Sequence, residues 1–370
     1  MSTNDRDLDD GVHKGVSQLL VRAAAADSRA DARLAVAIDD FFLPDEARLD
    51  DRLRGLIAAT LGSLVAAVEG ALRQHAVRLL VQRDEPEAAA ALERTGRPVL
   101  DRLVAAGLVR DADLMRELIA RVRQDLMADH LPSEAPADSD TPSLLSRLAT
   151  HADSVVAAGA MALLAAEARR RAMQDNGPTH QTDLPADLHH RLVWWVAAAL
   201  REHFNDTGAA SAAIDRSLAE AAMRSLAAHD ESDRLEAAAM RLAIAFDASP
   251  RELPPLLVEA LGDRRIALFI ALLAHALGVD FAQARAVVLD PVADRLWLVL
   301  RALELDRADI ARIALALSEA DPRRDIEAFA DALDCIAATP TETARRALST
   351  LKLHPDYRAA LLALSKARAA

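Results

Sequence analysis

Histidine and tryptophan pairs are the residues of this sequence with the most obvious chemical potential. His189 and His190 are adjacent, and Trp194 and Trp195 follow a few residues later. Neighbouring side chains on a helix point about 100° apart, so the two imidazoles need a third ligand from elsewhere to hold one metal ion. We therefore expect partly exposed structural histidines, with pH sensing as the functional alternative.

The tryptophan pair lies in the segment 188–200, which is apolar around most of its circumference. A helix of this kind is either central in a domain or covered by another chain, and tryptophan is enriched at interfaces. Burial in the core is the expected arrangement, and a subunit or partner interface is the alternative. His189, His190, Trp194 and Trp195 together form the candidate interaction surface.

Three further features have a simple structural interpretation. Cys335 is the only cysteine, so no internal disulfide can form and a reducing compartment is expected. Carboxylates at Asp331 and Asp334 raise the pKa of a nearby thiol, so Cys335 is expected to be buried and structural rather than nucleophilic. His75 lacks the residues that follow a phosphoacceptor histidine, and the acidic segment 321–334 is expected to be a solvated face.

The common catalytic and nucleotide-binding motifs are absent from the sequence. It contains no Walker-type glycine loop, no G-x-G-x-x-G, no G-x-S-x-G and no H-E-x-x-H. We therefore expect no cofactor, no bound metal and no enzymatic activity. An enzyme whose residues are scattered over loops remains the third alternative.

Composition narrows the choice of partner and compartment. The chain has 370 residues and a formal net charge of −13, a field that repels nucleic acid and anionic lipid. Arg169–Arg171 is its densest basic cluster and is too short to reverse that effect. The longest apolar stretch, 266–279, contains His275 and is shorter than a membrane span, so a buried helix is expected. With no signal peptide at the acidic start, the protein is expected in the cytoplasm.

Apolar residues recur at three- and four-residue spacing almost throughout, which predicts helices. The predicted helices cover residues 16–26, 31–41, 45–82, 86–106, 111–129, 142–150 and 153–174, and most of the chain from 185 onward. Gly107 is predicted to end the fourth of them.

Composition also predicts how these helices are divided. Residues 1–15 read as a disordered acidic N-terminus, 16–129 as an N-terminal helical lobe and 143–370 as a C-terminal helical-repeat lobe. The segment 130–142 contains three prolines and no apolar run, which is typical of a linker.

Aspartates mark the expected starts of short helices in the second lobe, because their carboxylates accept hydrogen bonds from free helix N–H groups. These are Asp263, Asp280, Asp290, Asp306 and Asp321. The pattern Asp-Pro-x-x-Asp occurs at 290–294 and again at 321–325, 31 residues later. This offset fits a helical-hairpin repeat, and two independent helix starts explain it equally well.

These patterns predict an all-α protein of stacked antiparallel helices, either HEAT-like or an irregular α-solenoid. The short connections force neighbouring helices to pack side by side.

Several stretches also resemble a known family. They are Phe41–Leu43, Arg97–Leu100, Gly107–Leu114, Leu184–Trp195 and Leu289–Leu300. Together they resemble the bacterial family called domain of unknown function 2336, over most of residues 16–350. The resemblance implies a largely helical fold and carries no catalytic residues.

The leading functional expectation is a non-enzymatic interaction or regulatory protein that presents a helix-lined surface to a protein partner or to itself. The alternative is a sensor that binds a small apolar molecule between helices near Trp194, Trp195 and Trp297. A closed apolar cavity would favour the sensor, and an exposed apolar patch would favour the interaction protein. Titratable groups with perturbed pKa values clustered in one cleft would favour an enzyme.

Overall fold

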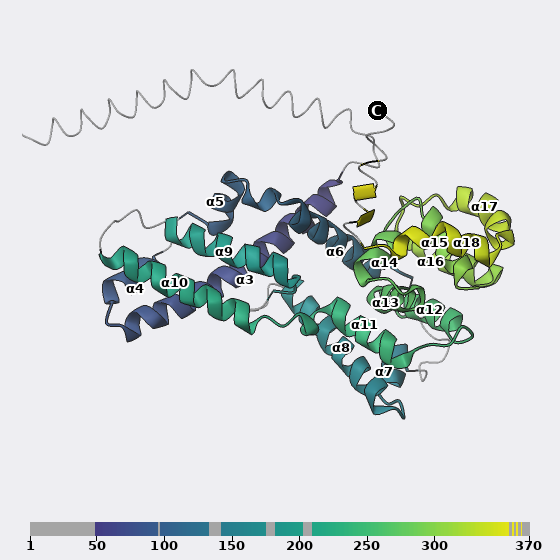
Figure 1. Ribbon diagram of the computed structural model, residues 1–370, viewed down its shortest axis with the longest axis horizontal. Coiled ribbons are helices and arrows are strands. Elements are labelled where there is room, and N and C mark those ends of the chain that lie inside the picture. Colours follow the sequence, from purple (N-terminus) through teal and green to yellow (C-terminus); the bar gives the residue numbers. More distant parts are fainter. Residues whose placement is uncertain are drawn as a thin grey trace, which may run out of the picture. The chain divides into compact units, whose positions relative to one another are not determined.

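The computed structural model describes residues 49–94, 97–132, 142–174, 182–202, 209–354, 357–358, 360–361 and 364. Within these ranges the regular elements are 16 α-helices and three short 3-10 helices, with no strand (Figure 1). The predicted all-α class is therefore confirmed. The chain divides into two units at 54/55, and the helix packing described below belongs to the second, Gly55–Ala370.

The first helices of the described residues are α3 (Asp51–Gln82), α4 (Pro86–Glu93), α5 (Val99–Ala105), α6 (Ala112–His130), α7 (Leu144–Leu148), α8 (Ser154–Gln174), α9 (Ala186–Glu202) and α10 (Ala209–Ala228). They are followed by α11 (Leu235–Phe246), α12 (Leu253–Gly262), α13 (Ile266–Leu277), α14 (Phe281–Val288), α15 (Asp294–Ala302), α16 (Arg307–Ala320), α17 (Ile326–Ala338) and α18 (Thr341–Ala347).

The predicted single helix at 86–106 is two helices, α4 and α5. Pro98 precedes α5, and the residue before a proline is disfavoured in the helical conformation. Gly107 follows α5 with φ of +73°, as the predicted helix end requires. The acidic N-terminus 1–15, the predicted helices 16–26 and 31–41, and most of the linker, 133–141, lie outside the described residues.

Helices from both predicted lobes contact one another. α9 packs on α5, and α10 packs on α9 and α4, although 130–142 separates them in sequence. α8 packs on α7 and α11, α11 on α13, and α13 on α12 and α14. The division into lobes 16–129 and 143–370 stays a prediction, and the described packing extends across it.

α13 lies in the apolar core. Every side chain from Ile266 to Ala274 is buried, and Phe269 is fully enclosed. This confirms the buried helix expected for the longest apolar stretch. Trp297 is also in the core, with its ring 4.7 Å from that of Phe329.

Two of the five predicted aspartate caps are confirmed. Asp280 forms a capping box with Gln283 at the start of α14, and the carboxylate of Asp306 accepts from the N–H of Asp309 at the start of α16. Asp263 was predicted as a cap, but it ends α12 and accepts from the N–H of Leu144 at 2.5 Å.

The two Asp-Pro copies were also predicted as caps, and neither fulfils that role. Asp290 and Asp321 each accept from the backbone N–H two residues later, both at 3.3 Å. This contact forms an Asx turn, so the proline lies in the turn and the helix begins further along the chain. The helices that follow are α15 and α17.

α3 is long and apolar enough to cross a membrane by length and composition alone. An 18-residue window within it has a mean hydropathy of 1.7, and 33% of that window is buried. α13 and α14 together also meet the criterion, but they are bent by 116° where they join. Core helices of soluble proteins satisfy the same test, so the expectation of no membrane contact stays a prediction.

Candidate functional site

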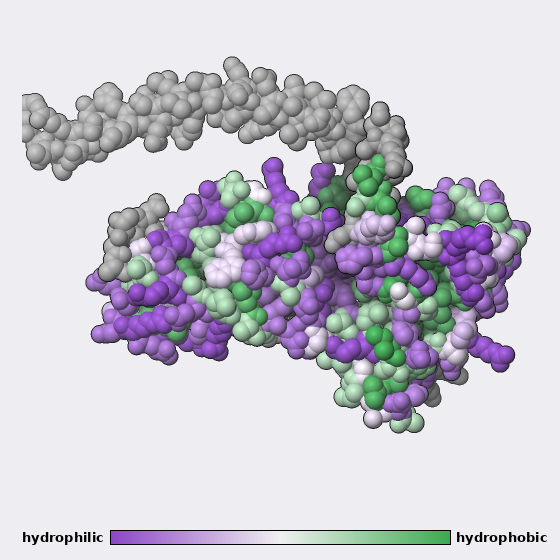
Figure 2. All heavy atoms as spheres, in the orientation of Figure 1, coloured by the Kyte–Doolittle hydropathy of each residue, from purple (hydrophilic) through white to green (hydrophobic). Residues whose placement is uncertain are grey.

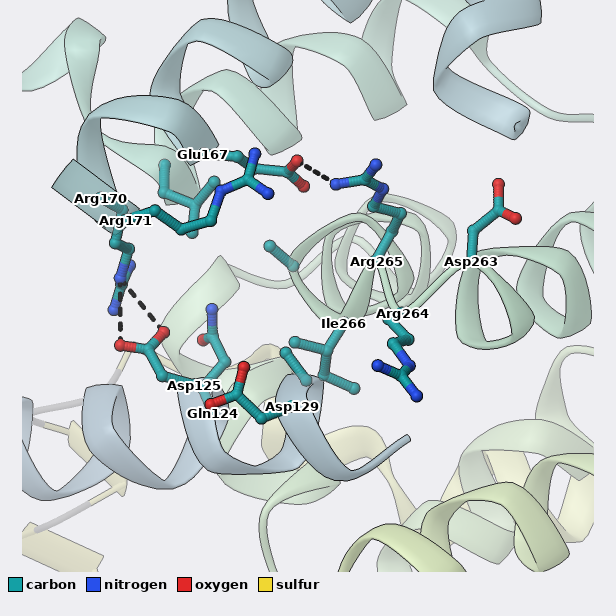
Figure 3. Close-up of a pocket in the computed structure, with 13 residues that line it drawn as sticks. Gln124, Asp125, Asp129, Glu167, Arg170, Arg171, Asp263, Arg264, Arg265 and Ile266 are labelled. Carbon is teal, nitrogen blue, oxygen red and sulfur yellow. Dashed lines mark hydrogen bonds and ion pairs between the residues drawn. The ribbon is translucent and has the colours of Figure 1, made fainter. Parts of the chain in front are cut away.

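A cleft of about 380 Å³ opens between α6, α8 and the start of α13 (Figure 3). We call it the charged cleft. Figure 3 shows Arg170 facing Asp125, and Glu167 facing Arg265, around the side chain of Ile266. Four acidic and four basic side chains line it, namely Asp125, Asp129, Glu167, Asp263, Arg170, Arg171, Arg264 and Arg265.

Glu167 is the titratable group of the cleft with the clearest chemical potential. Burial raises the pKa of its carboxyl, while Arg265 and Arg171 act in the opposite direction. A carboxyl with a raised pKa suits acid–base work. The carboxylate of Glu167 nevertheless accepts a hydrogen bond from Arg265. This ion pair gives Glu167 a structural role that needs no acid–base chemistry.

Arg170 connects the cleft to a buried cluster of charges. Its side chain is 3% exposed and lies 3.2 Å from a carboxylate oxygen of Asp125, 2.8 Å from Glu236 and 3.6 Å from Asp183. We call the whole cluster the central ion network. Its members are Glu117, Arg121, Asp125, Arg170, Asp183, Arg234, Glu236 and Arg285.

Glu236, in the first turn of α11, is the most highly connected acid of this network. Besides Arg170, it lies 3.5 Å from Arg234 and 3.8 Å from Arg285. Burial alone would raise its pKa, but the three guanidinium groups outweigh burial and lower the pKa to about 2. In contrast, burial and the charge of Glu236 raise the pKa of Asp183.

The network joins α6, α8, α11, α14 and the segment before α9. Glu117 on α6 pairs with Arg285 on α14, 168 residues away in sequence. Four positive and four negative side chains balance within it, as burial of so many charges requires. The sequence contained one weak signal of this network, the cluster Arg169–Arg171, of which only Arg170 is buried.

A second cavity, of about 260 Å³, lies between α3, α9 and α10. We call it the histidine cavity because His75, His189 and His229 all line it. The remaining lining residues are Ala71, Gln74, Arg78, Thr182, Ala221, Arg224, Ser225 and Ala228. The three histidines are far apart in the sequence, and only the packing of α3, α9 and α10 brings them together.

His189 is 4% exposed, so the expectation of a partly exposed side chain at this position was wrong. It shares a 2.7 Å hydrogen bond with Thr182 and stacks on His229, with ring centroids 4.1 Å apart. Burial first, and then His229, lower the pKa of His189 to about 4. His189 points inward because it lies on the same face of α9 as the buried Leu192.

The other members of the predicted surface are more accessible. His190 is exposed, and Trp194 and Trp195 are half-buried on α9. The indole N–H of Trp194 donates to His190 at 3.3 Å. His189 therefore does not belong to the candidate interaction surface. His190, Trp194 and Trp195 remain its predicted members.

Two other sequence expectations can be compared with the structure. Cys335 is exposed, so its predicted burial was wrong; it lies on the outer side of α17. The acidic side chains of α17 are exposed, as expected for a solvated face. Within the part of the chain that the structure describes, no three His, Cys, Asp or Glu residues are placed to hold a metal ion.

We expect His189 to make stability depend on pH. Its pKa is 6.5 in the unfolded chain and about 4 in the folded protein, so between these values only the unfolded chain binds the proton. The free energy of unfolding should therefore be insensitive to this group above pH 6.5. It should fall by on the order of 2 kcal/mol as the pH drops toward 4.

Urea unfolding at neutral and acid pH would measure this effect in His189→Asn and in the matched variant His190→Asn. The loss of stability on acidification should be smaller in His189→Asn. Equal losses in the two variants would show that another group causes the pH dependence.

The fold and the site together define an all-helical protein whose helices are joined by a buried, charge-balanced network. The chain belongs to the family described as uncharacterised protein conserved in bacteria (DUF2336), whose model matches residues 133–349. This confirms the resemblance, although the match is shorter than the expected 16–350. The stretches at 41–43, 97–100 and 107–114 lie outside it. No curated protein and no solved structure matches the chain.

Proposed function

We propose that this protein is a non-enzymatic interaction and regulatory protein of the scaffold type, acting in the bacterial cytoplasm. We further propose that it pairs with a second copy of itself through the outer face of α8. The observation that carries this proposal is an exposed apolar stripe along that helix.

The stripe follows helical spacing. One side of α8 packs on α7 and α11, while Val155 and Met161 on the other side are each 63% exposed. Figure 2 shows apolar surface gathered over the part of the molecule that contains α8 and α11. The α8 stripe consists of Val155, Ala158, Met161, Ala165 and Ala168, all exposed. Its last four members follow the 3-4-3 spacing of a helix–helix seam.

Charge placement favours a second copy as the occupant. Asp153 lies eight residues before Met161, and Arg169 lies eight residues after it. If two α8 helices cross antiparallel near Met161, Asp153 of each copy lies level with Arg169 of the other. Within one copy, Arg169 lies 3.6 Å from the carboxylate of Asp233. An isologous contact of this kind buries the same patch on both copies. The small alanines permit a close approach of the two helices.

Cysteine cross-linking tests this contact directly. In a Cys335→Ser background, Met161→Cys should form a disulfide-linked dimer under mild oxidation, because the two thiols meet at the crossing point. Val292→Cys is the matched control, since Val292 is apolar and 70% exposed but lies far from α8 in sequence. It should not cross-link.

Light scattering provides an independent measurement. The parent protein should be a dimer at about 100 µM, and Met161→Glu should be a monomer. A parent protein that stays monomeric at this concentration, with no Met161→Cys cross-link, would contradict the proposed dimer.

The proposal includes a stacked, HEAT-like arrangement of the C-terminal helices. The packing of α16 on α17 and of α15 on α18 supports it, together with the two Asx turns that lie 31 residues apart before α15 and α17. The net charge of −13 supports the expectation that neither nucleic acid nor a membrane is the partner.

A sensor is the second candidate function, and both cavities favour a polar ligand for it. The charged cleft and the histidine cavity are lined by ionisable groups, and no tryptophan lines either of them. The ligand would therefore be polar rather than the apolar molecule expected from the tryptophans.

A further inference from the structure

We propose that the histidine cavity binds a small molecule that carries a phosphate group, held by Arg78 and Arg224. This site is independent of the proposed α8 dimer, because it lies between α3, α9 and α10. Two arginines and three imidazoles line this one cavity and support the proposal.

The two arginines are available to a ligand. Arg78 on α3 and Arg224 on α10 both line the cavity and are exposed. Neither makes an ion pair or a hydrogen bond with another residue in the described ranges. The nearby acid Glu220 is already held by Arg83, whose guanidinium donates to both carboxylate oxygens at 2.7 and 2.6 Å.

Both arginines act electrostatically on a side chain that lines the cavity. Burial lowers the pKa of His75, and Arg224 and Arg78 lower it further, while Glu220 acts in the opposite direction. A positive potential confined to one cavity of a protein with net charge −13 concentrates anions there.

One imidazole adds unused hydrogen-bonding capacity. His75 Nδ1 is buried without a hydrogen-bond partner in the described residues. Buried polar atoms in native proteins are nearly always satisfied, so atoms of this kind lining a cavity indicate a missing partner. His229 is fixed at the cavity wall by a 3.0 Å hydrogen bond between its Nε2 and the carbonyl of Leu184.

The geometry favours phosphate over carboxylate. A carboxylate is planar and is satisfied by one guanidinium group in a bidentate pair. Here the hydrogen-bonding groups come from different helices, with Arg78 and His75 on α3 and Arg224 on α10. Donors from several directions fit the tetrahedral oxygens of a phosphate better. The volume of about 260 Å³ leaves room for only a small organic group beside it.

Binding should strengthen at lower pH. The charged and titratable groups that line the cavity are Arg78 and His75 from α3, His189 from α9, and Arg224 and His229 from α10 and its C-terminal end. Glu220 and His190 lie outside the lining and act on His75 and His189 electrostatically. Protonation of His75 or His189, as the pH falls toward their lowered pKa values, adds positive charge beside the anion. Sulfate keeps its two charges across this pH range, so a change in its affinity reports protonation of the protein.

Calorimetric titration with inorganic phosphate and with sulfate tests the proposal on the full chain. Arg224→Gln and Arg78→Gln should each weaken phosphate binding at least about tenfold. Arg216→Gln is the matched control, because Arg216 is an exposed arginine on the same helix and does not line the cavity. The phosphate affinity of Arg216→Gln should stay within about twofold of that of the parent protein. Circular dichroism of each variant verifies that its helices are intact.

Two results would overturn the proposal. One is the absence of binding of either anion to the parent protein up to about 20 mM. The other is equal weakening by Arg216→Gln and Arg224→Gln, which would assign the binding to overall surface charge. Sulfate affinity that does not increase between about pH 7 and about pH 4.5 would remove the imidazoles from the site, because the lowered pKa values of His75 and His189 place their protonation in this acid range.

Discussion

Glu236→Leu is expected to lower the free energy of unfolding by about 3–5 kcal/mol, a large share of the stability of an ordinary domain. Glu236 is 6% exposed and lies within 4 Å of three guanidinium groups. Its removal leaves Arg170, Arg234 and Arg285 buried with too little negative charge beside them. Urea unfolding at neutral pH measures the loss.

Glu220→Leu is the matched control, because Glu220 also pairs with an arginine but half of its side chain is exposed. Solvent weakens such a pair, so its loss should cost less than about 1 kcal/mol. Arg170→Met should be as destabilising as Glu236→Leu, and the double variant should lose less than the sum of the two. Additive losses would mean that the two residues do not act as one network.

Gly159→Leu is expected to lower the free energy of unfolding by about 3 kcal/mol, because it forces α8 away from α11. A Cβ atom at position 159 would lie 3.3 Å from the Cα and 3.4 Å from the Cδ1 of Leu242. The backbone of α11 cannot move aside without disturbing the helices packed behind it. A leucine side chain therefore has no space at this crossing.

Gly70→Leu is the control for this substitution. Gly70 is also inside a helix, and a Cβ atom there would meet nothing within 4 Å. Replacing an exposed helical glycine should increase stability by roughly 0.5–1 kcal/mol. Thermal unfolding of both variants should thus give shifts of opposite sign. A destabilised Gly70→Leu would contradict the open space around Gly70.

The central ion network also bears on the choice between an enzyme and an interaction protein. Clustered groups with perturbed pKa values would favour an enzyme, and the charged cleft contains such groups. Glu167 pairs with Arg265, and Arg170 pairs with Asp125 and Glu236, so each perturbed group already has a structural partner. These pairs give each perturbed group a structural role, which fits the proposed non-enzymatic function.

Local sequence patterns predicted the helices well. The apolar spacing from Asp51 to Gln82, the capping residues Asp280 and Asp306, and the end at Gly107 all depend on residues within a few positions of one another. The two Asp-Pro copies were misjudged, because an aspartate before a proline suits an Asx turn as well as a helix cap. Local chemistry alone does not separate these two outcomes.

The candidate sites could not be predicted in the same way. Glu117 and Arg285 are 168 residues apart, and the histidine cavity joins residues from α3, α9 and α10. His189 and His190 are adjacent in sequence, yet one is buried and the other exposed. A single residue step on a helix is enough to turn a side chain from the core to solvent.

The sequence by itself thus determined the helical class, most helix positions in the described residues, and the membership of the bacterial family. Helix formation depends on hydrogen bonds and side chains within one or two turns, so it can be inferred from short windows of sequence. The tertiary structure alone decided which charges pair, which histidines meet and which face of α8 stays exposed. Those outcomes depend on contacts between helices that are distant in the chain, and helical spacing does not encode which helices become neighbours.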